Sequence, residues 1–170
     1  MIRGRRVVIQ QELKQALLSA IYTAARVARD MVWGIQRPTL LGVRGLVVRN
    51  HEVLLIRHRS GERPWALPGG GVDRHERFEE AVRREVYEEA GVPADVECVL
   101  GVYEAFHSDL SNYIVTFVLR STADPRPPQS IEIAEARYFA FDDLPTDLDR
   151  GSHRRIAEYR AGRSGVSALW

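Results

Sequence analysis

The sequence predicts an α/β fold in which a mixed β-sheet lies between helices as an α/β/α sandwich. A length of 170 residues suits one ordinary domain with a small appendage. The apolar fraction of 45% and the charged fraction of 28% are typical of globular chains. Segments with strand and helix patterns alternate along the chain and include a hairpin, which favours a mixed sheet over a purely parallel one.

The first predicted element is a long amphipathic helix over residues 11–35. Apolar side chains recur there at helical spacing, and no proline occurs before Pro38. These side chains are Leu13, Leu17, Leu18, Ile21, Ala25, Ala28 and Val32. Pro38 marks a boundary, so we expect a helical extension over residues 1–37 and a globular domain over residues 38–170.

Charged residues interrupt the apolar run of this helix at Arg26, Arg29 and Asp30. The helix therefore lacks the roughly 18 consecutive apolar residues of a membrane span. We expect its apolar stripe to pack on its own domain or on the second subunit of a homodimer. The alternative is a helix that lies on a membrane surface with its arginines facing lipid phosphates.

A β-hairpin is predicted just after the boundary. Residues 43–48 and 53–57 are rich in β-branched side chains, and the turn Asn50-His51 joins them. Residues 60–71 hold several glycines and prolines and cannot be regular structure. This stretch is therefore predicted to be a shaped loop.

A helix over residues 76–90 follows the loop. It consists of good helix formers and stops at Gly91, with Pro93 just beyond. The remaining predicted elements are strands over 98–105, 113–120 and 136–141, a proline-rich loop over 124–130, a closing helix over 152–161 and a tail over 162–170.

Charge and cysteine content narrow the functional class. The net charge of +1 gives no reason to expect a nucleic-acid polymer as partner. Lys14 is the single lysine, so nearly all basic residues are arginines, which suit phosphate and are also favoured by some codon usages. The single Cys98 has no disulfide partner, and no secretory signal is evident, so we expect a reducing, cytoplasmic location. Its neighbours Val96 and Val99 predict a buried thiol.

Three glutamates of the predicted helix share one of its faces. Glu85, Glu88 and Glu89 lie three and four positions apart, so their like charges repel by a few tenths of a kcal/mol per pair. A solvated acidic face is the ordinary alternative, but the glycine run 68–71 just before the helix allows close backbone approach to a ligand. We therefore expect a cation among these three glutamates, and their hard oxygen ligands favour Mg²⁺ or Mn²⁺.

This arrangement resembles the Nudix box in every defined position. The matching residues are Gly70, Glu76, Arg84, Glu85, Val86, Glu88, Glu89, Gly91 and Val92. The resemblance covers residues 38–161 and implies a Nudix hydrolase domain over residues 38–170 with the Nudix-type sandwich fold. It also implies metal-dependent hydrolysis of a diphosphate bond in a small nucleotide-like molecule, by attack of water on phosphorus.

The resemblance further implies a role for each box residue. Glu85, Glu88, Glu89 and the Gly69 carbonyl would bind the metal, and Glu76 and Arg84 would support them. A box glutamate such as Glu88 or Glu85 is one source of the general base. Outside the box, Glu132 and Glu135 after the proline-rich loop are further candidates for a catalytic or metal role.

Substrate-binding candidates lie between the second strand and the box helix. Arg57, Arg59 and Arg63 are placed to clamp phosphate, and Gly70 is placed for backbone contact with the substrate. His107 and Asp109 lie where the fold often contacts the leaving group, which is an inference from position alone.

The organic half of the substrate stays open. No subfamily signature is evident, so the candidates are a nucleoside di- or triphosphate, a nucleotide sugar or ADP-ribose. One alternative function is an isoprenoid diphosphate isomerase, which needs a cysteine and glutamate pair, although Cys98 lies outside the glycine loop. Another is a non-catalytic ligand-binding module, which would normally have lost box glutamates.

Overall fold

The computed structural model describes residue 24 and residues 39–59, 64–107, 110–126 and 132–170. The predicted N-terminal helix and the extension over residues 1–37 fall outside these residues apart from Ala24, so both stay predictions. Within the described residues, no helix is long and apolar enough to cross a membrane.

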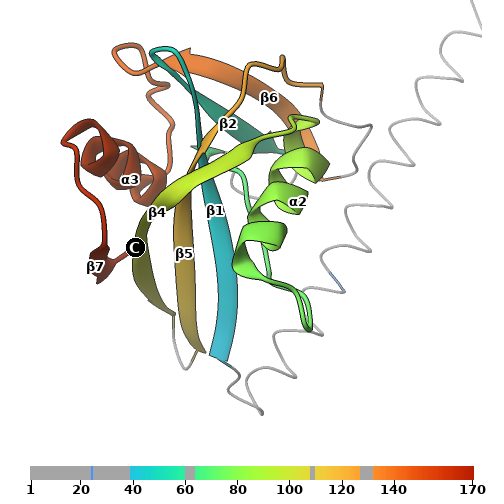
Figure 1. Ribbon diagram of the computed structural model, residues 1–170, viewed down its shortest axis with the longest axis vertical. Coiled ribbons are helices and arrows are strands. Elements are labelled where there is room, and N and C mark those ends of the chain that lie inside the picture. Colours follow the sequence, from blue (N-terminus) through green and yellow to red (C-terminus); the bar gives the residue numbers. More distant parts are fainter. Residues whose placement is uncertain (1–23, 25–38, 60–63, 108–109, 127–131) are drawn as a thin grey trace, which may run out of the picture. The chain divides into compact units, whose positions relative to one another are not determined.

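One mixed sheet forms the centre of the described domain (Figure 1). Its strands are β1 (Thr39–Arg49), β2 (Glu52–His58), β3 (Trp65–Ala66), β4 (Asp95–His107), β5 (Leu110–Arg120), β6 (Ile133–Ala140) and β7 (Val166–Leu169). Their order is β3-β2-β1-β5-β4-β7, with β6 paired to β2. β1 runs parallel to β5 and β4 parallel to β7, and the remaining pairs are antiparallel.

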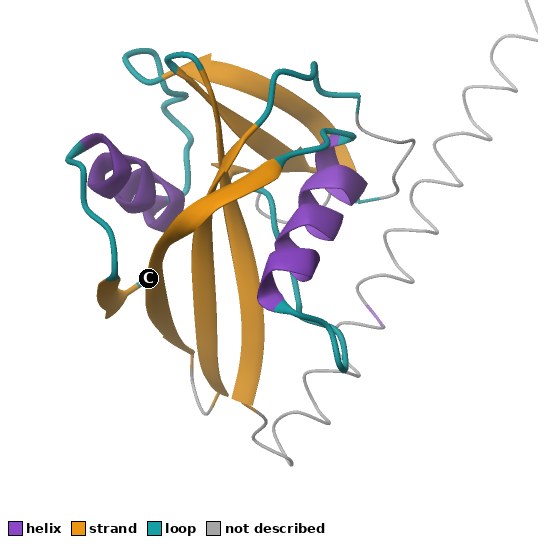
Figure 2. Cartoon of the chain, in the orientation of Figure 1, coloured by secondary structure: helices purple, strands orange, loops and turns teal. Residues whose placement is uncertain are grey.

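Two helices cover opposite faces of this sheet, α2 (Phe78–Ala90) and α3 (Arg150–Arg160) (Figure 2). α2 buries Val82 and Val86 completely in one core cluster, and fully burying such a side chain contributes about 1.5 kcal/mol or more. α3 buries Ile156 in a second cluster with Trp65 and Leu67. The predicted α/β/α sandwich with a mixed sheet is therefore confirmed.

Most predicted elements occur with shifted ends. The predicted hairpin is β1 and β2, joined at Asn50, whose φ of 53° is the left-handed conformation that such a turn needs. The box helix begins at Phe78 rather than residue 76 and ends, as predicted, before Gly91. The predicted tail contains β7, and the predicted loop over residues 60–71 contains the two-residue strand β3. Both were missed because these short strands form by pairing with other strands, β7 with β4 and β3 with β2.

The expectation that Cys98 is buried is wrong, because its side chain is exposed. The register of β4 against β5 shifts between Val96 and Cys98 and again between Val99 and Gly101. Each bulge breaks the alternation of inward and outward side chains. The apolar neighbours Val96 and Val99 therefore do not predict whether the side chain of Cys98 is buried.

Backbone pairing places the glycine loop beside β1. The Val43 N–H donates to the Gly70 carbonyl at 2.9 Å, and the Gly45 N–H donates to the Pro68 carbonyl at 2.8 Å. Gly45 also lets α2 approach closely, since a Cβ there would come within 2.7 Å of a Val86 methyl group. The loop is thus fixed along the strand that supports the helix, and the two meet where the box carboxylates lie.

Candidate active site

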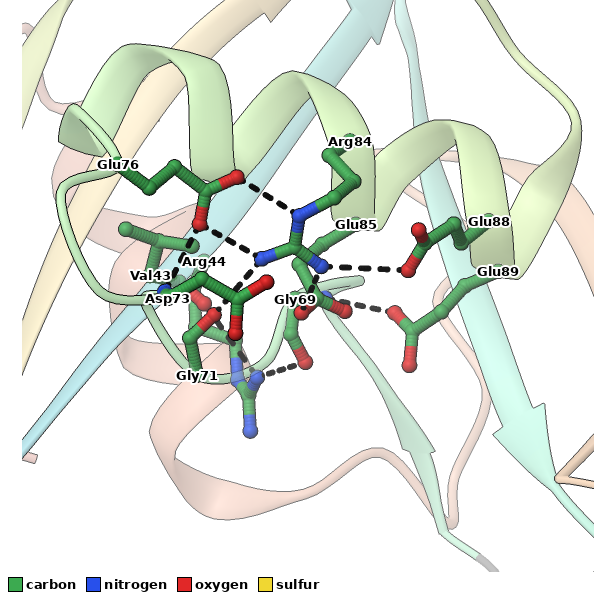
Figure 3. A network of polar contacts seen from close by, with 10 residues as sticks. All are labelled: Val43, Arg44, Gly69, Gly71, Asp73, Glu76, Arg84, Glu85, Glu88 and Glu89. Carbon is green, nitrogen blue, oxygen red and sulfur yellow. Dashed lines mark hydrogen bonds and ion pairs between the residues drawn. The ribbon is translucent and has the colours of Figure 1, made fainter.

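Glu89 forms the buried end of the site. Its side chain faces the glycine loop, and one carboxylate oxygen accepts the Gly69 N–H at 2.7 Å (Figure 3). Only 9% of the residue is exposed. Burial raises the pKa of Glu89 to about 7, although the Gly69 N–H acts in the opposite direction. The negative charge of a carboxylate buried in this way is only partly compensated, so a cation bound beside it would be stabilising.

Two glycines are required where the loop meets α2. Gly69 has a φ of 145°, and a Cβ there would collide with the Val43 carbonyl oxygen. Gly70 lies against the Glu85 carboxylate, because an added Cβ would stand 2.6 Å from both of its oxygens. Any larger residue at Gly70 would push Glu85 away from the loop.

Arg84 connects the carboxylates at the more open end. Its guanidinium bonds both oxygens of Glu76 at 2.7 and 2.9 Å, Glu85 at 2.8 Å and Glu88 at 3.2 Å (Figure 3). It also donates to the Gly71 carbonyl at 3.0 Å, which ties the helix to the loop. These contacts are those of a residue that holds other groups in place.

The carboxylates around Arg84 differ in their proton affinity. Hydrogen bonds from Arg84 and from the Asp73 N–H lower the pKa of Glu76 to about 2. Burial raises the pKa of Glu85 even though Arg84 opposes it. The Glu88 side chain is 57% exposed, so it faces solvent beside the buried pair.

Sequence reasoning missed Arg44 and His58. The Arg44 guanidinium donates to the Gly69 carbonyl, and burial followed by the charge of Arg44 lowers the pKa of His58. An arginine inside an otherwise apolar strand was the available signal for Arg44. His58 ends β2 just after a bulge, so its side-chain direction could not be derived from alternation.

The donor set fits a hard divalent cation such as Mg²⁺. Glu85, Glu88, Glu89 and the Gly69 carbonyl offer only oxygen ligands, and the burial of the Glu89 carboxylate favours a positive charge beside it. Within the part of the chain that the structure describes, no three acidic, histidine or cysteine side chains already converge as a metal cluster. Glu85 instead faces Arg84, and the Gly69 carbonyl faces Arg44.

Of the predicted phosphate-binding arginines, the two that the structure describes contact groups other than the box carboxylates. Arg57 pairs with Asp147 at 2.7 Å and stacks 4.7 Å from the centre of the Trp65 ring. Arg59 is exposed and donates to the Ile133 carbonyl at 3.1 Å. Arg63 lies outside the described residues.

The candidates from the later loops have mixed outcomes. Glu132 is exposed but close enough for its charge to raise the pKa of Glu89, after larger effects of burial and other neighbours. Glu135 is exposed and lies opposite Arg57 in the pairing of β6 with β2. Asp109 and the side chain of His107 lie outside what the structure describes.

Comparison with known proteins decides the family. The family model of the NUDIX domain matches residues 38–159, which is most of the chain and includes the whole box. The chain belongs to the Nudix family. This membership places it among the Nudix pyrophosphohydrolases, as the names of its relatives also indicate.

The similarity to known relatives covers different shares of their length. This chain is 31% identical to an ADP-ribose pyrophosphatase of Methanocaldococcus jannaschii, over 74% of this chain and 75% of the relative. It is 40% identical to diphosphoinositol polyphosphate phosphohydrolase 3-alpha of Mus musculus, but over 44% of each chain. A crystal structure of a MutT NUDIX hydrolase from Burkholderia pseudomallei has a TM-score of 0.63 and 29% identity, covering 71% of this chain and 98% of that one.

Proposed function

We propose that the Nudix domain hydrolyses the diphosphate bond of a nucleoside-diphosphate-linked small molecule with the help of Mg²⁺ or Mn²⁺. The observation that carries the proposal is the buried Glu89 carboxylate, which accepts the Gly69 N–H at 2.7 Å beside the glycine loop. Burial raises the pKa of this carboxyl to about 7. Such a group is costly unless a cation binds beside it.

The metal ligands in this proposal are Glu85, Glu88, Glu89 and the Gly69 carbonyl. A divalent ion bound there would neutralise the diphosphate and lower the pKa of a water that attacks phosphorus. The task of Arg84 is to hold Glu76, Glu85 and the Gly71 carbonyl in fixed positions, since it bonds all three.

Proton removal from water is assigned to a carboxylate near these ligands. Glu88 is the candidate from the box, because it lies on the same helix face and is exposed enough to reach water. Glu132 is the candidate from outside the box, since its charge acts on Glu89. In the reaction, water adds to one phosphorus, its proton passes to the carboxylate, and the other phosphate half leaves.

ADP-ribose is the first substrate to test. The relative from Methanocaldococcus jannaschii, aligned over 74% of this chain, is named an ADP-ribose pyrophosphatase. ADP-ribose has the predicted chemistry of a diphosphate between two organic groups. Nucleotide sugars and nucleoside triphosphates are the next candidates. The cytoplasmic location expected from the single cysteine agrees with substrates of this kind.

The test is a panel of ADP-ribose, a nucleotide sugar and a nucleoside triphosphate, incubated with the full chain in Mg²⁺ or in EDTA. In water enriched in ¹⁸O, one phosphate product should carry the label, and EDTA or Glu89→Gln should abolish its release. Cleavage that persists in EDTA and in Glu89→Gln would contradict the proposal. Tight binding of a panel member without turnover would favour the binding-module alternative.

A further inference from the structure

Arg44 contacts the one backbone carbonyl in the proposed metal ligand set. It lies in β1 beside the fully buried Val43, and its guanidinium donates to the Gly69 carbonyl (Figure 3). The same peptide group is held from its other side, since the Gly69 N–H donates to Glu89 at 2.7 Å. The direction of the carbonyl is thus fixed, and a cation of the protein stands where it points.

The charge of Arg44 also acts on two proposed ligands. Its guanidinium lies at the Gly69 peptide, which itself bonds the Glu89 carboxylate, and its charge acts on the carboxylates of Glu85 and Glu89. Arg44 therefore offsets part of the negative charge at this end of the site. A divalent ion bound by the same carboxylates and carbonyl would be repelled by the guanidinium at short range.

We propose that Arg44 is a substrate-binding residue that leaves the Gly69 carbonyl to the metal and binds phosphate oxygens of the substrate's diphosphate. The proposal rests on the proposed function. A guanidinium matches two phosphate oxygens at once, and a half-buried arginine has the reach to exchange one oxygen partner for another. The substrate's negative charge compensates Arg44 once the metal compensates the carboxylates, so the two ligands favour each other's binding.

The same strand supplies a matched control. Arg49 also lies in β1, but its guanidinium pairs with Glu52 at 3.1 Å and with Asp124 at 2.7 Å, away from the glycine loop. Arg49→Gln removes the same charge from the same strand without disturbing the Gly69 carbonyl. Arg44→Lys keeps the charge and loses the fork, which separates repulsion of the metal from recognition of phosphate.

The experiment measures two affinities on the full chain. Mn²⁺ binding is followed by electron paramagnetic resonance without substrate, and methylenediphosphonate binding by calorimetry in saturating Mg²⁺. Arg44→Gln should bind Mn²⁺ about fivefold more tightly and methylenediphosphonate about tenfold more weakly, the size expected for one partly screened charge. Arg44→Lys should bind Mn²⁺ like the parent and methylenediphosphonate more weakly, and Arg49→Gln should match the parent in both.

Two results would overturn the assignment of Arg44. Weaker or equal Mn²⁺ binding by Arg44→Gln would show that the guanidinium only supports the carbonyl. Unchanged methylenediphosphonate binding would show that it does not bind the substrate. If the parent binds Mn²⁺ but Arg44→Gln behaves like Arg49→Gln, the Arg44 assignment alone fails; if the parent binds no Mn²⁺, the proposed function fails with it.

Discussion

Glu76 and Glu89 belong to the same motif but have opposite environments. Glu76 bonds the Arg84 guanidinium through both oxygens, and these bonds lower its pKa to about 2. Glu89 is buried against the Gly69 N–H, and burial raises its pKa to about 7. The first carboxylate has its counter-charge within the protein, whereas the second has a large part of its charge left to be compensated.

The two environments suit two different tasks: Glu76 fixes the position of Arg84, and Glu89 binds the metal ion. A carboxylate whose charge is already neutralised by an arginine gains little from a metal, so Glu76 serves to keep Arg84 and the loop in place. A desolvated carboxylate gains much, so Glu89 is the group that a divalent cation stabilises most. Both are glutamates of a single motif, so only their contacts distinguish the supporting carboxylate from the metal-binding one.

The largest effect is expected from Glu89→Gln. It should lower turnover by about two powers of ten or more at saturating Mg²⁺, because a ligand charge at the reacting centre is lost. Circular dichroism should show an unchanged fold. Glu79→Gln, which removes an exposed charge from the first turn of the same helix, is the control and should keep parental turnover. Turnover within threefold of the parent in Glu89→Gln would refute the ligand role.

The pH dependence of stability without metal tests the burial of Glu89. Because its folded pKa of about 7 lies above the ordinary 4.5, the folded protein binds the proton more tightly than the unfolded chain does. The resulting stabilisation is present below pH 4.5 and is lost as the pH rises to about 7. In EDTA, the unfolding free energy should fall across this window by on the order of 2 to 3 kcal/mol relative to Glu89→Gln. Parallel curves for the two proteins would contradict the burial.

Glu76→Gln should have a smaller effect on turnover than Glu89→Gln. Loss of the supporting charge frees Arg84 and loosens the loop, which should lower turnover by about tenfold and metal affinity by no more than that. Steady-state kinetics at increasing Mg²⁺ should show partial recovery, since the metal ligands themselves are intact. A loss of turnover at saturating Mg²⁺ as large as that of Glu89→Gln would contradict the supporting role of Glu76.

The smallest effect is expected at Arg57. Its pair with the half-exposed Asp147 is of a kind worth about 0 to 1 kcal/mol, and it faces Trp65 rather than the glutamates. Arg57→Gln should therefore change KM by less than about threefold. A KM raised tenfold or more, with kcat retained, would instead support the prediction from sequence that Arg57 clamps phosphate.

Sequence reasoning succeeded where the signal is local. The shared helix face of Glu85, Glu88 and Glu89 and the end of the helix before Gly91 depend only on local signals, and the structure has the helix with that end. It failed where long-range packing decides, as for β7 and the exposed Cys98. Arg44 was missed for the same reason.

The contrast between Arg84 and Arg44 makes this plain. Arg84 lies inside the motif, one helical turn before Glu88, and the resemblance to the Nudix box already implied that it supports the box carboxylates. The approach of Arg44 to the Gly69 carbonyl depends on the pairing of the loop with β1, which no local pattern predicts. In the same way, the bulge in β2 beside His58 is set by its pairing with β6.

The most direct test of the contrast is Mn²⁺ titration of the parent, Glu89→Gln and Glu76→Gln, followed by electron paramagnetic resonance at pH 7.5. The account predicts that Glu89→Gln loses the site, with affinity lowered about a hundredfold or more, whereas Glu76→Gln retains it within about tenfold of the parent. Unchanged Mn²⁺ affinity in Glu89→Gln, or a loss in Glu76→Gln as large as that in Glu89→Gln, would contradict the assignment of Glu89 as a metal ligand and of Glu76 as a support for Arg84.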